Sequence, residues 1–305
     1  MTDREKIMYA VIGQLSNTDI PLIFKGGLIT KLILQENDYK AVKRYTKDID
    51  ANWIALPPKM EDLVTAIQDS IDKISFDYNV KITREYGVNR SAGIAIVSKS
   101  SNKTVFTMDI DMKPFLGSKL YGAGNIIIKG VLADEIIADK LYVTSTDKIY
   151  KYRAKDLIDL FALAHCCEIN TRVVVGLIIK KGNQIKSFDG LINHKTELEH
   201  AYNSLTGIES KPSYEEIYHY LTRFIKPFIG QDLPNMIWNP NKAAWENPYY
   251  IEITHLDAER LASVGIKVHG NLSNKDRNVV AINANHRAKA DSILSQSRNN
   301  KKYKK

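Results

Sequence analysis

The 305-residue sequence predicts an α+β fold with a mainly helical C-terminal part. Over the first 170 residues, helical and strand patterns follow one another irregularly, whereas a doubly wound sheet needs regular strand–helix alternation. Several segments that alternate with a period of two predict successive antiparallel strands in this region. Beyond Asn170 most apolar residues recur at helical spacing, which indicates helices that pack through one face.

The elements of the first region are predicted from periodicity and from the residues that end them. Ile7, Val11 and Leu15 lie on one face of a helix, and Pro57 follows a strand that alternates around Ile49. The expected helices cover residues 3–15, 28–35, 59–74, 131–145 and 152–168. The expected strands cover residues 21–24, 48–56, 76–87, 91–98, 103–112 and 125–130.

The second region is expected to be helical over residues 171–182, 195–205 and 213–228. Ser213 and Glu216 form a capping-box pattern at the start of the last of these helices, and Pro227 ends it. The segment 233–250 is rich in Pro and Asn and predicts a loop. We therefore divide the chain into a first domain of residues 1–170, a helical domain of residues 171–285 and a basic tail of residues 286–305 that is expected to be disordered.

The formal net charge of +8 comes largely from the C-terminus, where the last eight residues contain five bases and no acid. Such a tail is commonly a solvated arm, and its alternative role is to bind a polyanion such as nucleic acid. No apolar run approaches the roughly 20 residues of a membrane helix, and the N-terminus lacks the apolar core of a secretory signal. We therefore expect a cytoplasmic protein without a membrane partner.

Asp48 and Asp50 form a pair of carboxylates on a short apolar strand. Successive strand residues point to opposite faces, so both acids lie on one face while Ile49 and Ala51 lie on the other. Carboxylates this close repel each other unless a cation lies between them, and their oxygens are ligands that suit Mg²⁺. The alternative is an exposed strand end, where such a pair has no special role.

Gly26 and Gly27 stand between a short apolar strand and a helix. Glycines at this position let the backbone approach a phosphate closely, and the helix N-terminus supplies free N–H groups and a favourable dipole. The alternative is that the two glycines only make a tight turn.

A two-metal site for phosphoryl transfer needs a third carboxylate. Asp109 and Asp111 on a later strand are the candidates, and they share a face with each other. Acids from two apolar strands are costly to bury without a cation. Asp109 directly follows the apolar stretch and is the preferred candidate.

Two helices carry further charged residues in apolar surroundings. Lys140 lies within a mostly apolar helix, and Asp156 and Asp159 lie on one side of the next helix. A buried aspartate needs a partner, which Lys140 or Arg153 could supply. The alternative is that these acids serve only as helix caps or in salt bridges.

Taken together, these motifs resemble the AbiEii/AbiGii-type nucleotidyltransferase toxins of bacterial abortive-infection and toxin–antitoxin systems, which are related to polymerase β-type nucleotidyltransferases. The motifs are the Gly26–Gly27 pair, RYTKDID, EIIADKL and RAKDLIDL, in that order over about residues 20–165. The resemblance implies a polymerase β-type core with a mixed sheet, followed by a helical domain.

The resemblance also implies a nucleotide site and a metal site. Gly26 and Gly27 correspond to the turn that binds the nucleotide phosphates. Asp48 and Asp50 correspond to the catalytic metal pair, and Asp109 to the third metal ligand.

Lys140 corresponds to the basic residue that contacts the nucleotide phosphates, and Asp156 or Asp159 to the last acidic motif of the catalytic residues. The implied activity is the transfer of a nucleoside monophosphate from an NTP, with Mg²⁺ or Mn²⁺, to an acceptor that we expect to be the 3′ end of tRNA, which blocks translation and growth. A cognate antitoxin is the implied partner, with or without direct contact. The alternatives are transfer to a small molecule or a protein, and a non-catalytic protein that binds nucleotide or RNA.

Overall fold

The computed structural model describes residues 3–86, 90–149, 153–230, 232–270, 272 and 277–302, and its side-chain description ends at residue 295. The α-helices are α1 (Asp3–Ser16), α2 (Gly26–Glu36), α3 (Met60–Asp72), α4 (Ala133–Thr144), α5 (Ala154–Cys166), α6 (Thr171–Lys180), α7 (Asp189–Ile192), α8 (Lys195–Asn203), α9 (Tyr214–Ile225), α10 (His255–Ser263) and α11 (Arg287–Lys302). The strands are β1 (Leu22–Lys25), β2 (Lys43–Arg44), β3 (Asp48–Trp53), β4 (Tyr78–Arg84), β5 (Ser91–Ser98), β6 (Thr104–Asp111), β7 (Ser118–Ala123), β8 (Ile126–Val131), β9 (Ile169–Asn170), β10 (Ile208–Ser210), β11 (Ile237–Asn239), β12 (Ala244–Glu246), β13 (Pro248–Ile253) and β14 (Asn278–Asn283).

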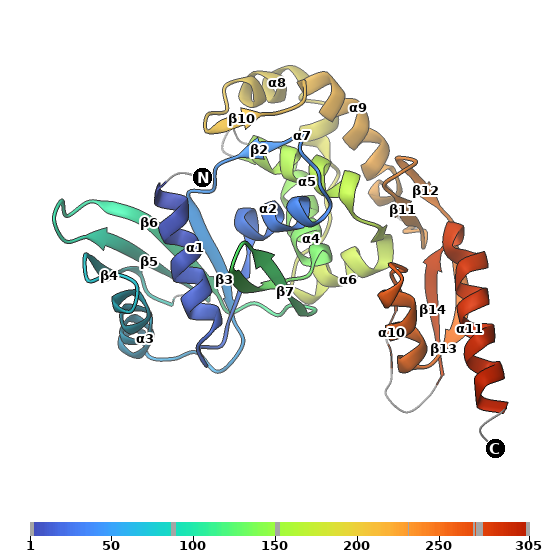
Figure 1. Cartoon of the computed structure of the whole chain (residues 1–305). Helices are drawn as coiled ribbons and strands as arrows, with labels where there is room; N and C mark the ends of the chain where they lie inside the picture. The colour runs from blue at the N-terminus through green and yellow to red at the C-terminus, as the bar shows by residue number, and fades with distance from the viewer. Residues whose placement is uncertain are drawn as a thin grey trace.

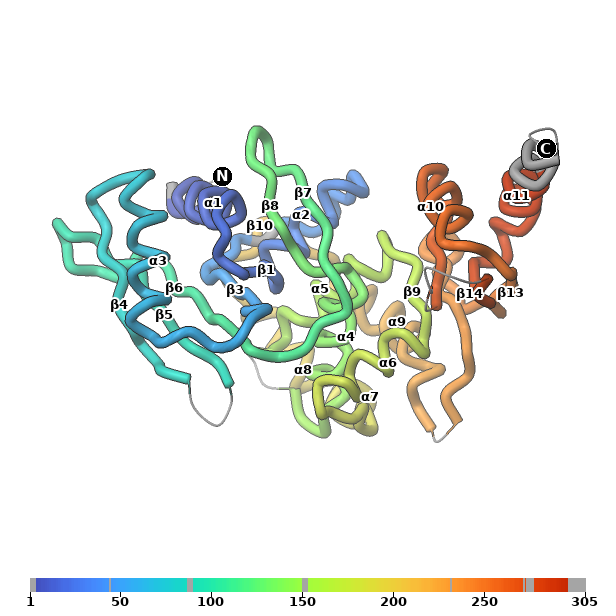
Figure 2. Tube along the Cα trace, turned by 90° about the horizontal axis from the view of Figure 1, so that it is seen from below, coloured from blue at the N-terminus to red at the C-terminus, as the bar shows by residue number. Residues whose placement is uncertain are grey.

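A mixed sheet of seven strands forms the centre of the described fold, in the order β4-β5-β6-β3-β1-β8-β7. The pairs β3–β6 and β1–β8 are parallel, and the other neighbours are antiparallel. Figures 1 and 2 both place α3 and β4–β6 at one end of the molecule and α10 and α11 at the other. The α+β class expected from the sequence is therefore confirmed.

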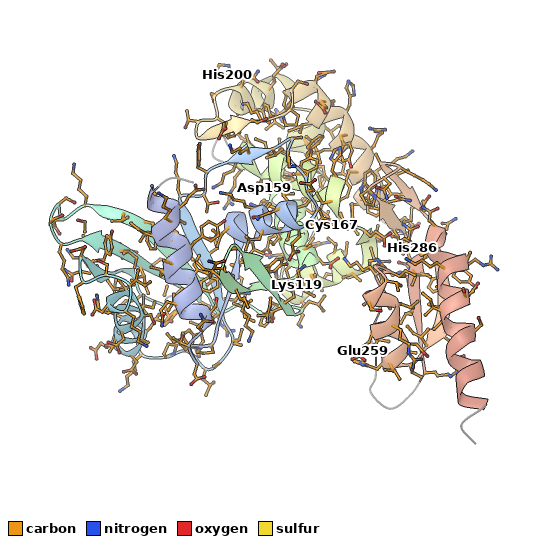
Figure 3. All side chains as sticks on the ribbon, in the orientation of Figure 1. Lys119, Asp159, Cys167, His200, Glu259 and His286 are labelled. Carbon is orange, nitrogen blue, oxygen red and sulfur yellow. The ribbon has the colours of Figure 1, made fainter. Side chains whose placement is uncertain are left out.

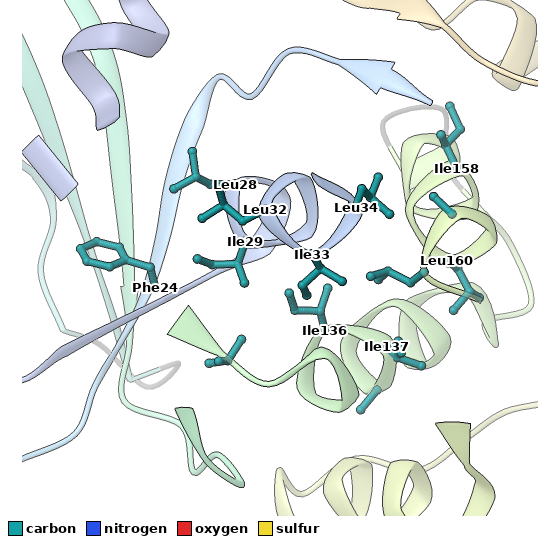
Figure 4. Packing of buried hydrophobic residues seen from close by; sticks show 14 of the residues in the cluster. Phe24, Leu28, Ile29, Leu32, Ile33, Leu34, Ile136, Ile137, Ile158 and Leu160 are labelled. Carbon is teal, nitrogen blue, oxygen red and sulfur yellow. The ribbon is translucent and has the colours of Figure 1, made fainter. Parts of the chain in front are cut away.

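The helix α2 is apolar on most sides and packs into the main hydrophobic core between β1, α4 and α5 (Figure 4). Its residues Leu28, Leu32 and Ile33 are buried there together with Ile136 of α4 and Leu160 of α5. Burial contributes roughly 1.5–3 kcal/mol for each large apolar side chain. The core therefore fixes the position of α2 and of the turn that precedes it.

A short two-stranded sheet joins distant parts of the chain. Strand β10 pairs with β2 in antiparallel orientation, with Ile208 opposite Arg44. The Tyr45 amide donates a hydrogen bond to the Gly207 carbonyl at 3.1 Å, next to this pair. The segment 204–208 is thereby held against the residues that lead into β3.

The helices expected at 171–182, 195–205 and 213–228 are present as α6, α8 and α9, whereas the described residues beyond Leu233 differ from the loop and the disordered tail expected there. Strands β11 and β12 and the start of β13 lie in the segment 233–250, which was expected to be a loop, and β13 and β14 form an antiparallel pair. Residues 287–302 of the expected tail form α11, which buries Ala290 and Leu294 against this pair. Two apolar residues spaced four apart in a polar sequence are only a weak signal for a helix, and so α11 was not expected. The bases at the end of the tail lie outside the described side chains.

The described apolar residues form a main core from Met8 to Trp238 and a smaller core from Ile251 to Leu294. This packing continues across the boundary predicted at residue 170, and the predicted domain boundaries stay predictions. None of the described helices combines the length and apolar character needed to cross a membrane.

Candidate active site

One row of residues crosses five neighbouring strands, from β1 to the edge strand β4. Lys25 of β1 lies opposite Asp50 of β3, and Asp50 lies beside Asp109 of β6. The row continues through Gly93 of β5 to Arg84 of β4. Directly paired residues share a face of a sheet. This charged row therefore has two acids in its middle and a cation at each end.

Asp48 and Asp50 lie on one face of β3, as predicted, because Ile49 and Ala51 are buried on the other face. Asp48 is exposed and accepts a hydrogen bond from Thr107 Oγ1 at 2.8 Å. We call Asp48, Asp50 and Asp109 the acid cluster, since they occupy neighbouring positions on β3 and β6.

The surroundings of Asp50 disfavour an isolated negative charge. Burial raises the pKa of its carboxyl above the ordinary value, and the nearby Asp109 carboxylate acts in the same direction. The cations Lys25, Lys140 and Lys155 act in the opposite direction. A further cation beside Asp50 would therefore be bound favourably.

Gly26 turns the chain from β1 into α2 with φ of +68°, a conformation that favours glycine. A Cβ atom at this position would lie 1.9 Å from Asp50 Oδ2, so only glycine allows the backbone to come so close to the acid. Lys25, the residue before the helix, provides no side-chain cap, which leaves the first N–H groups of α2 for another acceptor. An anion such as phosphate is the ligand that suits this helix end.

The two candidates for the third acid have different partners. Asp109 Oδ1 accepts a hydrogen bond from Arg84 Nη2 at 2.8 Å, whereas Asp111 Oδ2 accepts one from Lys25 Nζ at 2.5 Å. Asp111 is thus paired with the lysine that ends β1. Asp109 is in register with Asp50 and is the acid that completes the cluster.

Lys140 is held by the two aspartates of α5. Its Nζ lies 2.5 Å from Asp156 Oδ1 and 3.0 Å from Asp159 Oδ2, and both aspartates are at most 1% exposed. Arg153 Nη1 lies 3.4 Å from the other oxygen of Asp156. Figure 3 labels Asp159 in the interior of the molecule. We call Lys140, Asp156 and Asp159 the lysine network; its ion pairs match the salt-bridge alternative that the sequence left open.

A cleft of about 740 Å³ brings most of the predicted site residues together. The predicted residues that line it are Gly27, Asp48, Asp50, Asp109, Lys140 and Asp156. Asp159 lines a neighbouring cavity of about 310 Å³, which Gly27 also borders. The first glycine, Gly26, reaches the site through its contact with Asp50.

The predicted metal ligands do not form a finished metal site. Among the residues that the structure describes, no group of three or more His, Cys, Asp or Glu side chains could hold a metal ion. Two of the three acids have protein partners: Arg84 donates a hydrogen bond to Asp109, and Thr107 donates one to Asp48. Carboxylate oxygens are nevertheless the donors that Mg²⁺ prefers, and Asp50 lacks a counter-charge strong enough to offset its burial.

The sequence prediction missed several residues that border the site. Lys25 directly precedes the glycine pair and could have been found as part of that motif. Lys155 is exposed and lines the cleft one position before Asp156. The position of Arg84 beside Asp109 depends on strand register, which the sequence does not reveal. The segment 204–208 forms another part of the cleft lining and lies far from the motifs in sequence.

An acid-lined cleft beside an uncapped helix N-terminus is typical of enzymes that act on phosphate esters. The family model for the nucleotidyl transferase AbiEii toxin of type IV toxin–antitoxin systems matches residues 7–206. The chain therefore belongs to the AbiEii family, and the resemblance inferred from its motifs is confirmed. It is a nucleotidyltransferase and a toxin of a type IV toxin–antitoxin system.

The structure is similar to that of MenT4, a nucleotidyltransferase toxin from Mycobacterium tuberculosis H37Rv. The TM-score is 0.50 and the sequence identity 17%, over 73% of this chain and 82% of the MenT4 chain. At this identity the likeness concerns the fold, and it confirms the expected nucleotidyltransferase fold. No curated protein matches the sequence.

Proposed function

We propose that this toxin transfers a nucleoside monophosphate from an NTP to the 3′ end of tRNA, with Mg²⁺ as its metal, and thereby blocks translation. The observation that carries the proposal is the close approach of Gly26 to Asp50 Oδ2. This contact joins a phosphate-binding helix end to the acid cluster in one cleft.

In this reaction the β- and γ-phosphates of the NTP lie at the N-terminus of α2, and the α-phosphate lies beside Asp48 and Asp50. The 3′-hydroxyl oxygen of the acceptor forms a bond to the α-phosphorus. The bond from this phosphorus to the bridging oxygen breaks, and pyrophosphate leaves with the electron pair. The hydroxyl proton passes to the Asp109 carboxylate.

Asp48, Asp50 and Asp109 are the residues that would hold a divalent cation, and the cation would supply positive charge that stabilises the transferred group and pyrophosphate. Lys25 and Lys140 add positive charge at the sides of Asp50, as their effect on its pKa indicates. The lysine network therefore holds the Lys140 ammonium in place at the wall of the cleft while the phosphates bind.

Basic side chains on the cleft wall offset its acids and could contact the phosphates of a polyanionic acceptor. Lys47, Arg153 and Lys155 line the cleft in addition to Lys140. The basic tail predicted from the sequence would add to the attraction of RNA. Translation takes place in the cytoplasm, which is the proposed place of action, and the cognate antitoxin would act there with or without direct contact.

The test is a labelling experiment with the purified protein. Each α-³²P-labelled NTP is incubated with the protein, Mg²⁺ and total cellular RNA and protein, and the products are separated by size. We expect label in RNA of tRNA length, its loss with EDTA, and its loss when periodate has destroyed the 3′-terminal diol. Label in protein or in a small molecule would support transfer to those acceptors instead, and nucleotide binding without any label would support a non-catalytic protein.

A further inference from the structure

Arg84 reaches the acid cluster because β4 is irregular at its end. The register of β4 against β5 shifts between Ile82, which faces Ile94, and Arg84, which faces Gly93. This is the pattern of a β-bulge with Thr83 as the extra residue, and bulges often re-aim side chains next to active sites.

The bulge decides on which face of the sheet Arg84 lies. In a regular ladder Arg84 would face Ala92, which is buried on the same face as Ile94 and Ile110 in the main core. The shift by one residue places it opposite Gly93 instead, in the charged row with Asp109. The irregularity therefore moves an arginine from the core face to the face of the acid cluster.

Gly93 makes room for this arrangement. A Cβ atom at Gly93 would lie 2.6 Å from Thr83 Oγ1 and 3.3 Å from Arg84 Cβ. A larger residue at this position would require the Thr83 and Arg84 side chains to shift, so Gly93 leaves the space that the bulge uses.

The ion pair of Arg84 with Asp109 is easily exchanged. The arginine side chain is 53% exposed and the aspartate side chain 49% exposed. A pair this exposed contributes little to stability, because solvent screens its charges. A guanidinium group binds phosphate through two parallel hydrogen bonds, which is a stronger contact than this single bond of 2.8 Å.

The geometry of the reaction assigns the two ends of the charged row to different groups. In an in-line displacement the attacking and leaving oxygens lie on opposite sides of the phosphorus. Lys25 and the N-terminus of α2 are on the β1 side of Asp50, which is the side that the proposed function gives to the leaving pyrophosphate. Arg84 is on the opposite side, beyond Asp109. The acceptor therefore enters from the side of Arg84.

We propose that Arg84 binds a backbone phosphate of the RNA acceptor and releases Asp109 when it does so. This inference rests on the proposed function. Arg84 thus has two partners, one after the other. It neutralises Asp109 while the cleft lacks substrate, and it positions the acceptor strand once the acceptor has bound.

The first test compares steady-state kinetics of Arg84→Ala with those of the natural protein. We expect the KM for tRNA to rise about tenfold, while the KM for NTP stays unchanged, because the arginine faces the acceptor side. The slope of log affinity for RNA against log salt should become shallower by about 0.7–1, the contribution of one phosphate contact. Arg84→Lys should retain part of the affinity, because it keeps the charge without the planar group.

A matched control is Arg260→Ala on α10, which removes an arginine that lies 3.4 Å from Asp257, away from the cleft. It should leave the KM for tRNA and the salt slope unchanged. A second measurement is RNA binding without NTP by Asp109→Asn, which should be tighter because Arg84 has lost its competitor. The gain should disappear in the double variant Arg84→Ala with Asp109→Asn.

An unchanged KM for tRNA in Arg84→Ala, or a rise in the KM for NTP instead, would overturn the inference. So would a gain in RNA binding that persists in the double variant. If the natural protein labels no RNA at all, the proposed function fails and this inference fails with it. If the natural protein labels RNA and Arg84→Ala does so with the same KM and salt slope, only the role of Arg84 fails.

Discussion

Two groups of charged side chains border the same cleft and are held in different ways. In the acid cluster, Asp109 is 49% exposed and forms an ion pair with the half-exposed Arg84, and Asp48 is exposed. In the lysine network, Asp156 and Asp159 are at most 1% exposed and share one ammonium group. Solvent screens the exposed Arg84–Asp109 pair of the acid cluster, and burial disfavours the charge of Asp50, whereas the two aspartates of the lysine network are buried together with their counter-charge.

The largest expected effect tests whether the acid cluster carries the activity. Asp50→Asn should lower nucleotidyl transfer by about a thousandfold or more, because it removes negative charge at the place where a cation would be bound. Its melting temperature should stay the same or rise, since burial already disfavours the charged carboxyl. Single-turnover kinetics and thermal melting measure the two effects.

The matched control for this variant is Asp111→Asn, which changes an aspartate on the same face of β6 as Asp109. It removes a carboxylate that is paired with Lys25 rather than placed in the acid cluster. It should retain transfer within about tenfold, which corresponds to 1.4 kcal/mol. Equal losses in Asp50→Asn and Asp111→Asn would show that the face as a whole, and not the acid cluster, carries the activity.

The second-largest expected effect tests whether the lysine network stabilises the fold. Lys140→Ala should lower the free energy of unfolding by about 3–5 kcal/mol, because it leaves two buried carboxylates without their ammonium partner. Urea denaturation measures this loss. Adding Asp156→Asn and Asp159→Asn to Lys140→Met should restore much of the stability without restoring transfer. A stable Lys140→Ala that only loses NTP affinity would contradict the structural part of the comparison.

Gly26→Ala should have an intermediate effect on stability. The positive φ costs about 1–2 kcal/mol for a residue with a Cβ atom, and that atom would also push Asp50 away. Transfer should therefore fall more than the melting temperature suggests. Gly176→Ala in α6 is the control, because nothing lies within 4 Å of its Cβ position, and it should stabilise the protein by about 0.5–1 kcal/mol. Similar transfer rates for the two alanine variants would remove the steric argument.

The smallest effect concerns Lys155, which is exposed and lines the cleft. Lys155→Ala should lower transfer less than about fivefold at low salt, because it acts on Asp50 only through its charge. The difference from the natural protein should vanish near 1 M salt, where charges are screened within about 3 Å. A defect that persists at high salt would mean that Lys155 contacts the substrate directly.

Much of the catalytic part could be predicted from the sequence because its elements are periodic. The alternation around Ile49 placed Asp48 and Asp50 on one face of β3, and the glycine pair marked the start of α2. The pairing of Asp109 with Arg84 could not be predicted, since it depends on strand order and on a one-residue bulge. A local pattern contains no information about which strands become neighbours.

The C-terminal part was harder for a different reason. Strand β13 begins at Pro248 and follows a segment rich in Asn and Pro, so turn signals concealed it. In the first region, β7 was also not expected, because its sequence, with exposed Leu120 beside buried Tyr121, has little apolar alternation. In both places the strands are stabilised by pairing with a partner rather than by a strong pattern of their own.

The pairing of β10 with β2 has a consequence for the synthesis of the protein. The cleft is lined by Gly27 and Asp50 from the beginning of the chain and by the segment 204–208 from much further along it. A ribosome must therefore release the chain beyond Ile208 before the last part of the cleft lining can fold into place. We therefore expect the nascent toxin to lack a complete cleft until its own synthesis is well advanced.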